Sequence, residues 1–315
     1  MLADRVIFLR GFGLRNPAAG LPVTSQTLFN IGSCTKPFTA LAVVLAADAG
    51  LLSLDDSPRK FLPYFKLRDA DADRVVTLRD LLSHRTGVLD DLGAGWFERY
   101  PTHEALIRAA MQREPTAAVG QRFQYNNYMY LAAGEALAAA QGTTFERVMA
   151  ERVLGPLQMR ASNLSVATMA AGSDFSFGFS SDSARRQLPM DTLAYLSGIA
   201  PAGGINSNVE DMAQWVRLML AGGALNGTRL VSDTGYRQLL TPAVKTAAGE
   251  YGLGLFIEAW HGHRLFHHPG GVLGFGTSCN FLPDLRLGWV VLTNVDDQAL
   301  PKAVREIIYD NLVRR

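Results

Sequence analysis

Residues 30–40 read NIGSCTKPFTA, and they lead into the apolar segment FTALAVVLAADAGLL at residues 38–52. Ser33 and Lys36 therefore stand three residues apart where the chain enters its most apolar stretch. Burying an ammonium group without a partner is expensive. Lys36 must either point to water or form part of a functional site.

The apolar residues of this segment predict an α-helix over residues 37–52. Gly50 supplies a stop signal near its end. Pro37 is tolerated at its start because the first N–H groups of a helix have no intrahelical partner. The residues that recur at the helical spacing i, i+3, i+4, i+7 are Phe38, Leu41, Ala42 and Leu45.

The pair Ser33 and Lys36 has the outline of an activated nucleophile. At the N-terminal edge of the helix, Ser33 lies among free N–H groups and the positive end of the helix dipole. Lys36, three residues later, lies on the same face, and burial lowers the pKa of a lysine so that it can act as a base. The S-x-x-K pattern alone is common, and a solvated lysine near a helix cap is its ordinary alternative.

The composition is that of a folded globular protein without a nucleic-acid or membrane footprint. The chain has 315 residues, 48% hydrophobic and 19% charged, with a net charge of +1. Asp48 interrupts the most apolar stretch, which is shorter than the ~18–20 residues of a membrane span. The first residues, MLADRVIFLRGFG, do not resemble a signal peptide, so the sequence as written predicts a cytoplasmic protein. The two cysteines, Cys34 and Cys279, predict buried thiols and no disulfide scaffold.

Periodicity and turn signals predict strands at the two ends of the chain and helices between them. RVIFLRGFG at 5–13 is typical of a strand that ends in a glycine turn. Helical patterns occupy 103–113 and 207–223, and KAVREIIYDNLV predicts a closing helix at 302–313. Hairpin-spaced short strands are predicted at 251–260, 263–268, 274–283 and 287–295.

This order of elements predicts an α+β fold. We expect an antiparallel sheet closed by both termini and flanked by helices, with a helical lobe inserted. The whole chain, 1–315, is predicted to be a single domain. Its α/β lobe would comprise about 1–50 and 205–315, and its helical lobe about 51–204.

Two further motifs accompany the serine and lysine. Tyr125-Asn126-Asn127 forms a Y-x-N pattern just ahead of an alanine-rich helical stretch. His268-Pro269-Gly270 lies on one of the predicted strands near the end of the chain.

With these motifs the sequence resembles the serine β-lactamase and penicillin-binding-protein-like superfamily. Within it, the resemblance is to the class C-like branch of β-lactamase-related serine hydrolases, which includes family VIII carboxylesterases and D-aminopeptidases. It covers nearly the whole chain, and ordered blocks are more specific than any single motif. The blocks are LFNIGSCTKPFTALAVVLAADAGLLSLDD, TLRDLLSHRTGV, FQYNNYMYLAAGE, PAGGINSNVEDMAQW and HHPGGVLGFG.

The resemblance implies a β-lactamase/transpeptidase-like fold and assigns roles to individual residues. Ser33 would attack the substrate carbonyl, and Lys36 would take its proton. Tyr125, held partly as phenolate by the neighbouring ammonium, would protonate the leaving group and later activate water. Asn127 would hydrogen-bond Lys36 and the acyl group. His268 of the third motif would be a further catalytic residue, in the same cleft as Ser33. The backbone N–H groups of Ser33 and Gly271 would form the oxyanion hole.

The chain departs from the family pattern at its third motif. Penicillin-recognising enzymes usually have Lys-Thr/Ser-Gly where this chain has His268, Pro269 and Gly270. A histidine is mostly neutral at pH 7, and proline brings neither a hydroxyl nor an N–H donor. Both changes weaken a grip on a substrate carboxylate, which favours neutral acyl esters over penicillins.

A second departure concerns the N-terminus. Relatives begin with a helix and one more strand before the counterpart of RVIFLRGFG. Either the sequence is truncated, or the sheet is filled in another way. Truncation would also hide any signal peptide and would leave a periplasmic or secreted location open.

Other side chains are weaker candidates. His84 is expected to brace a turn. Four histidines lie close together in the sequence: His261, His263, His267 and His268. They lack the spacing of metal ligands, so no metal is expected. Gly270, Trp96 and Phe275 are predicted to contact substrate, as could Phe97 and Tyr195, although ordinary packing is the commoner role of such aromatic residues.

The sequence therefore predicts a serine hydrolase that acts through an acyl-enzyme, without metal or organic cofactor. The preferred function is a carboxylesterase on small acyl esters, with weak β-lactam hydrolysis. One alternative is a peptidase for D-amino-acid or cell-wall peptides, or a β-lactamase. Another is a penicillin-binding or sensor protein that never turns over. The expected partner is a small ester, amide or β-lactam, and the sequence does not fix the oligomeric state.

Overall fold

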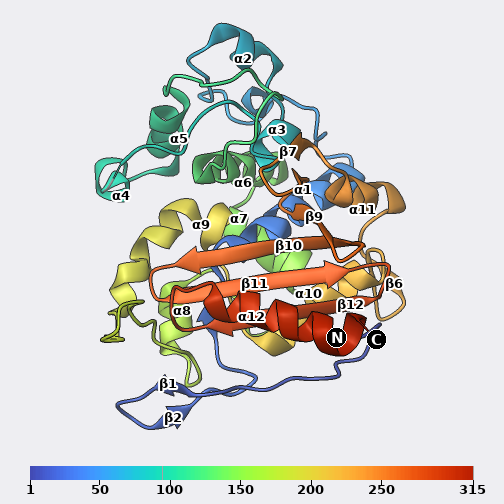
Figure 1. Cartoon of the computed structure of the whole chain (residues 1–315). Helices are drawn as coiled ribbons and strands as arrows, with labels where there is room; N and C mark the ends of the chain where they lie inside the picture. Colours follow the sequence, from blue (N-terminus) through green and yellow to red (C-terminus); the bar gives the residue numbers. More distant parts are fainter. Residues whose placement is uncertain (94, 315) are drawn as a thin grey trace.

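A six-stranded antiparallel sheet in the order β12-β11-β10-β9-β8-β7 lies at the centre of the computed structural model, which describes residues 1–93 and 95–314 (Figure 1). The predicted α+β class with an antiparallel sheet is confirmed. The strands are β7 (Val244–Lys245), β8 (Glu250–Tyr251), β9 (Phe256–Trp260), β10 (His263–Val272), β11 (Phe275–Leu282) and β12 (Leu287–Thr293).

The hairpin between β10 and β11 forms the middle of the sheet. Its register pairs His268 with Cys279 and Gly271 with Gly276. A two-residue loop joins the strands, and its Gly274 has φ +81°, a left-handed conformation that glycine adopts without strain. Gly270, in the third sequence motif, lies close to the backbone of Ile31 and Cys34, which flank Ser33.

Helices cover both faces of the sheet. Helix α10 (Val209–Leu220) and helix α12 (Ala299–Ile308) pack against β11 and β12, with α12 in front of the sheet and α10 behind it in Figure 1. The predicted helix at 207–223 is thus confirmed, and the predicted closing helix begins three residues earlier than expected. A π-helical turn, Tyr309–Val313, continues α12.

Two long buried helices form the core next to the sheet. Helix α1 (Lys36–Asp48) follows the 3₁₀ turn η1 (Gly32–Thr35), as the apolar period predicted, and contacts α6 (Asn127–Gln141). Short helices surround them: η2 (Pro58–Lys60), α2 (Ala70–Val75), α3 (Leu78–Leu82), α4 (Trp96–Arg99), α5 (His103–Met111), α7 (Phe145–Val148), η3 (Met149–Leu154), α8 (Val166–Ala171), η4 (Met190–Ile199), α9 (Ala200–Gly203) and α11 (Asp233–Leu240).

The strand predicted at residues 5–13 is wrong. Met1 pairs with Gly288 at the edge of β12, where its amino group donates to the Gly288 carbonyl at 2.8 Å. A tight turn, with Ala3 at φ +53°, then carries the chain away from the sheet. High strand propensity does not form a strand without a partner to pair with. The chain instead forms a separate ribbon of β1 (Leu14–Asn16) and β2 (Leu21–Pro22).

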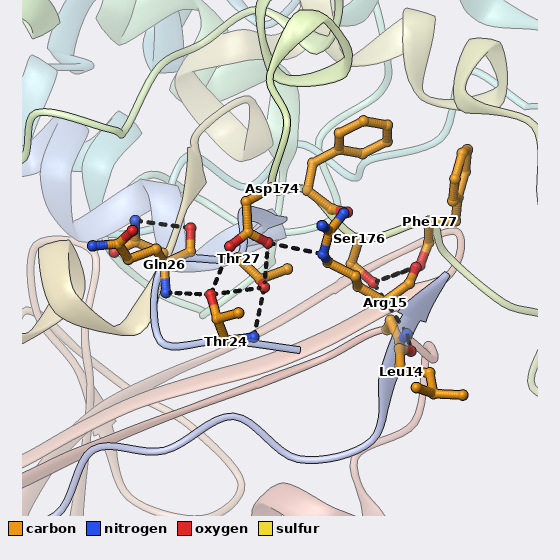
Figure 2. A network of polar contacts seen from close by, with 11 residues as sticks. Leu14, Arg15, Thr24, Gln26, Thr27, Asp174, Ser176 and Phe177 are labelled. Atoms are coloured by element: carbon orange, nitrogen blue, oxygen red, sulfur yellow. Dashed lines mark hydrogen bonds and ion pairs between the residues drawn. The ribbon is translucent and has the colours of Figure 1, made fainter. Parts of the chain in front are cut away.

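A polar network fixes this ribbon to the rest of the molecule (Figure 2). The Asp174 carboxylate accepts hydrogen bonds from Thr24 Oγ1 and Thr27 Oγ1, both at 2.6 Å, and lies 3.0 Å from Arg15 Nε. Strand β3 (Phe29–Asn30) follows directly and pairs with β4 (Asn206–Ser207). The network therefore anchors the segment that leads into Ser33. A further small ribbon consists of β5 (Ala224–Leu225) and β6 (Thr228–Arg229).

Candidate active site

Ser33 lies in the turn η1, immediately before helix α1. The turn begins at Gly32, which has φ +50° and donates its N–H to Asn30 Oδ1 at 2.8 Å. A side chain at Gly32 would come within 3.0 Å of the Gly271 nitrogen on β10. Glycine at this position thus allows both the left-handed backbone and the close approach of Ser33 to the sheet.

Lys36 is the first residue of α1, and its side chain is fully buried. Its Nζ lies 3.0 Å from Ser33 Oγ and donates to Asn127 Oδ1 and to the Ala202 carbonyl, each at 2.8 Å. Burial lowers the pKa of Lys36 to about 7, although the nearby Asp90 carboxylate opposes this. A substantial fraction of Lys36 is therefore neutral at pH 7, as a base acting on Ser33 requires.

Tyr125 lies beside the same ammonium group. Lys36 Nζ is 4.6 Å from the centre of the Tyr125 ring, and the Ser33 side chain is near enough to the Tyr125 hydroxyl to lower its pKa. The expected partial phenolate is wrong: burial raises the pKa of Tyr125, and the nearby Ser33 side chain offsets only part of that effect. At pH 7 this side chain is a neutral phenol that can donate a proton.

His84 holds the loop that presents Tyr125 and Asn127. Its carbonyl accepts from the Gln124 N–H at 2.7 Å, and its Nδ1 accepts from the Asn126 N–H at 3.0 Å. Its ring centre lies 4.2 Å from that of Tyr125. His84 thus braces a turn, as the sequence predicted, and that turn is part of the site.

Gly270 and Gly271 bring β10 against the serine turn. A Cβ atom at Gly270 would overlap the Ile31 carbonyl oxygen and Thr277 Oγ1. Gly270 therefore serves close packing, and its carbonyl accepts from Gln298 Nε2 at 2.9 Å. Gly271 lines the same cavity as Ser33.

The structure places His268 in an aromatic cluster rather than at the cavity. Its side chain is buried; Nδ1 donates to the Pro269 carbonyl at 2.6 Å, and Nε2 accepts from the Tyr251 hydroxyl at 3.2 Å. Burial lowers the pKa of His268 well below its usual range, so the ring is neutral, as predicted. Both ring nitrogens are occupied, which leaves no donor for a substrate.

Ser33, Asn127 and Gly271 line a cavity of about 190 Å³. Trp96 contributes to its wall, as predicted, together with Tyr128 and Tyr195. The expectation for Phe275 is wrong, because this ring is buried in the core and packs edge-to-face against Phe29 at 6.3 Å. Its position on β11 turns it away from the serine.

Two carboxylates near the cavity were not predicted from the sequence. Asp90 Oδ2 accepts from the backbone N–H of Asn127 at 3.1 Å and from its Nδ2 at 2.7 Å. Asp296 lies so close to Gly271 that a Cβ atom there would be 3.0 Å from its Oδ1. Burial raises the pKa of both carboxyl groups. The signal for Asp90 was its position two residues after the end of the SHRTGV segment.

The crowded histidines form separate pairs. His263 Nδ1 lies 2.6 Å from Asp284 Oδ2, and His267 Nε2 lies 3.0 Å from Glu258 Oε1. In residues 1–93 and 95–314, no group of three or more His, Cys, Asp or Glu side chains is arranged to hold a metal ion. Nor does any helix in this part of the chain have the length and apolarity to cross a membrane.

The fold is that of the β-lactamase-fold serine hydrolases. The Beta-lactamase family model matches residues 2–310, so the chain belongs to this family.

Individual relatives agree with this assignment. Unguisins hydrolase ungD' of Aspergillus campestris is 27% identical over 317 residues, which cover 91% of this chain and 55% of that protein. The octameric penicillin-binding protein homologue from Pyrococcus abyssi has a TM-score of 0.84 and 29% identity, over 97% of this chain and 72% of that one. A D-stereospecific amidohydrolase from Streptomyces sp. shares the fold, with a TM-score of 0.75 and 23% identity over 92% of this chain and 88% of that one. The chain spans between 55% and 60% of the length of the curated relatives it matches.

Proposed function

We propose that the protein hydrolyses small carboxylic esters through an acyl-enzyme on Ser33. The observation that carries this proposal is the 3.0 Å contact between Ser33 Oγ and a fully buried Lys36 whose pKa is about 7. A serine hydroxyl is a weak nucleophile until a neighbouring base removes its proton. Neutral Lys36 supplies that base.

The reaction has two steps. Ser33 Oγ bonds to the substrate carbonyl carbon as its proton moves to Lys36 Nζ. The N–H groups of Ser33 and Gly271 stabilise the oxyanion, and the Tyr125 phenol gives its proton to the departing alkoxide. Lys36 returns the proton to Tyr125. In the second step water attacks the acyl carbon by the reverse route, releasing the carboxylic acid and restoring the Ser33 hydroxyl.

The charges around the cavity support esters rather than penicillins. Among the described residues that line the cavity, none is Lys or Arg. His268 is neutral and engaged with Pro269 and Tyr251, and the Asp296 carboxylate lies beside Gly271. A substrate carboxylate placed near Gly271 would meet a negative charge without a fixed cation to offset it.

Acid quenching followed by peptide mass spectrometry tests the proposal. After mixing with p-nitrophenyl butyrate, we expect a butyryl group on the peptide that contains Ser33. Ser33→Ala should lose both the adduct and the release of nitrophenol, whereas the exposed-site control Ser181→Ala should keep both. Release that persists in Ser33→Ala, or an adduct on another residue, would overturn the assignment.

A further inference from the structure

Asp90 occupies an unusual position for a carboxylate. It lines the serine cavity, and the Asn127 side chain that binds it also accepts a hydrogen bond from Lys36. Both hydrogen bonds from Asn127 go to one oxygen, Oδ2. Among the described residues, none donates to Asp90 Oδ1 and no Lys or Arg forms an ion pair with Asp90. Its negative charge near the cavity is therefore only partly compensated.

The wall next to Asp90 is aromatic. Trp96 packs edge-to-face against Tyr128, with ring centres 5.8 Å apart, and against Tyr195 at 6.2 Å. Burial raises the pKa of both tyrosines, so both are neutral rings at pH 7. The faces of tryptophan and tyrosine attract cations, and they do so more strongly where water is excluded.

The lining of the cavity determines what meets these groups. Ser33 shares this cavity of about 190 Å³ with Asp90 and the aromatic wall. An acyl group bonded to Ser33 inside the cavity therefore lies beside them. A neutral hydrocarbon there would remove water from the carboxylate without forming a hydrogen bond or ion pair in its place. Removing water from a charged group in this way costs free energy.

We propose that Asp90, Trp96, Tyr128 and Tyr195 form a subsite for an ammonium group on the acyl part of the substrate. The preferred substrates are then esters or amides of amino acids with a free amino group. This inference rests on the proposed function, because it places the acyl group on Ser33. The Asp90 carboxylate attracts the ammonium group by its negative charge, and the aromatic rings attract it at their faces.

Two esters of nearly the same shape separate the effect of the substrate's charge from the effect of its shape. Alanine methyl ester and methyl isobutyrate differ in an ammonium group that replaces a methyl group. An α-ammonium group with a pKa of about 7.7–8.0 is mostly charged at pH 7. The measured quantity is the ratio of kcat/KM for the alanine ester, taken for each enantiomer, to that for the isobutyrate. Comparing this ratio between variants cancels the different chemical reactivity of the two esters.

Asp90→Asn should lower this ratio at least tenfold, because its amide oxygen can still accept from Asn127 while the charge is gone. Asp91→Asn is the matched control, since Asp91 is exposed and pairs with Arg113 at 3.4 Å, and its ratio should stay within twofold of wild type. Trp96→Leu should lower the ratio by a smaller factor, and it keeps the test open if Asp90→Asn fails to fold. Equal effects of Asp90→Asn on both esters would overturn the subsite.

Failure of the proposed function gives a different result. In that case neither ester shows turnover that depends on Ser33. Ligand-observed NMR with Ser33→Ala then tests the subsite by itself. Tighter binding of alanine methyl ester than of methyl isobutyrate, lost on adding Asp90→Asn, would uphold the subsite, and equal binding of the two would overturn it.

Discussion

At the scale of single residues, Lys36 lies under opposing influences. Burial disfavours its ammonium form, and the Asp90 carboxylate favours it. The other titratable groups around it add little charge at pH 7. His84 and His268 are buried and neutral, and burial raises the pKa of the Cys34 thiol to about 12. The balance leaves Lys36 with a pKa of about 7, within the range where a base works best.

This balance predicts the pH dependence of the reaction. With a neutral ester, kcat/KM should rise with pH to a plateau and should reach half of its maximum near pH 7. Well below pH 7 it should fall tenfold for each pH unit. Asp90→Asn removes a charge that favours the ammonium form, so the midpoint should move to lower pH. A rate profile from pH 5 to 9 measures both. A flat profile, or a midpoint above pH 9, would contradict Lys36 as the base.

At this scale, the geometry can be predicted from the sequence where local spacing decides it. Ser33 and Lys36 share one helix start, so their contact follows from helical periodicity. The protonation state of the Tyr125 hydroxyl and the orientation of the His268 ring could not be predicted from the sequence. Both depend on how deeply distant segments bury these side chains. The Ala202 carbonyl is a backbone atom without a sequence signature.

At the scale of elements, the approach of β10 to the serine turn depends on Gly270. The Thr277 hydroxyl on β11 donates to the Ile31 carbonyl at 2.8 Å, and Gly270 fits against both groups. Strand β10 and turn η1 are therefore in direct backbone contact. A side chain at this point must push them apart.

Gly270→Ala should lower the free energy of unfolding by about 2–3 kcal/mol, because a methyl group would overlap backbone and a buried hydroxyl. Gly271→Ala is the matched comparison on the same strand. Its methyl group would meet only the end of the Asp296 side chain, so the change should stay within about 0.5 kcal/mol. Urea unfolding of the two variants measures the difference. Equal stability of both variants would contradict the close approach.

Helix α12 is held to the sheet by apolar contacts and by one cluster of charges. Val304 and Ile308 pack over Trp260, Leu287 and Trp289. Beside them, Glu258 lies 3.0 Å from His267 on β10 and accepts from Arg305 on α12 at 3.0 Å. His267 and then Arg305 hold the pKa of the Glu258 carboxyl at about 2.

The low pKa of Glu258 predicts acid sensitivity of this helix. Because its pKa is lower in the folded state, the ionised Glu258 carboxylate stabilises the folded protein. This contribution is complete above the ordinary pKa of 4.5, and it is lost as the pH falls toward about 2. Glu258→Gln should be less stable than wild type at pH 7 and should lose less stability between pH 4.5 and 2. Urea unfolding followed by tryptophan fluorescence at several pH values measures this.

Glu306→Gln is the control on α12, because Glu306 is exposed and 3.9 Å from His261. Its stability should follow the wild-type pH dependence. If Glu258→Gln and wild type lost stability in parallel below pH 4.5, the charge cluster would not hold the helix.

At the scale of the whole molecule, the two ends of the chain behave differently. The hairpins after Glu250 and the closing helix could be predicted because each strand has its partner nearby in sequence. Residues 5–13 have the composition of a strand, yet the turn at Ala3 directs them away from the open edge of β12. Pairing between distant segments is a property of the assembled fold, and propensity alone does not specify it.

The distribution of charge around the cavity bears on substrate choice. Asp90 lines the cavity, and Asp296 lies beside Gly271, close to its wall. Asp296→Asn should raise the acylation rate with benzylpenicillin relative to p-nitrophenyl butyrate by about threefold, since one partly exposed like charge is removed. Competition kinetics at low salt measure this ratio. An unchanged ratio would mean that Asp296 does not repel anionic substrates.

The proposed mechanism requires that Ser33 forms an acyl-enzyme that water then hydrolyses. A stopped-flow trace of nitrophenolate release from p-nitrophenyl butyrate, for wild type and Ser33→Ala, measures both steps. We predict continuing release after the first turnover in wild type and none above background in Ser33→Ala. A single stoichiometric burst without further release, or equal release from both proteins, would overturn this mechanism.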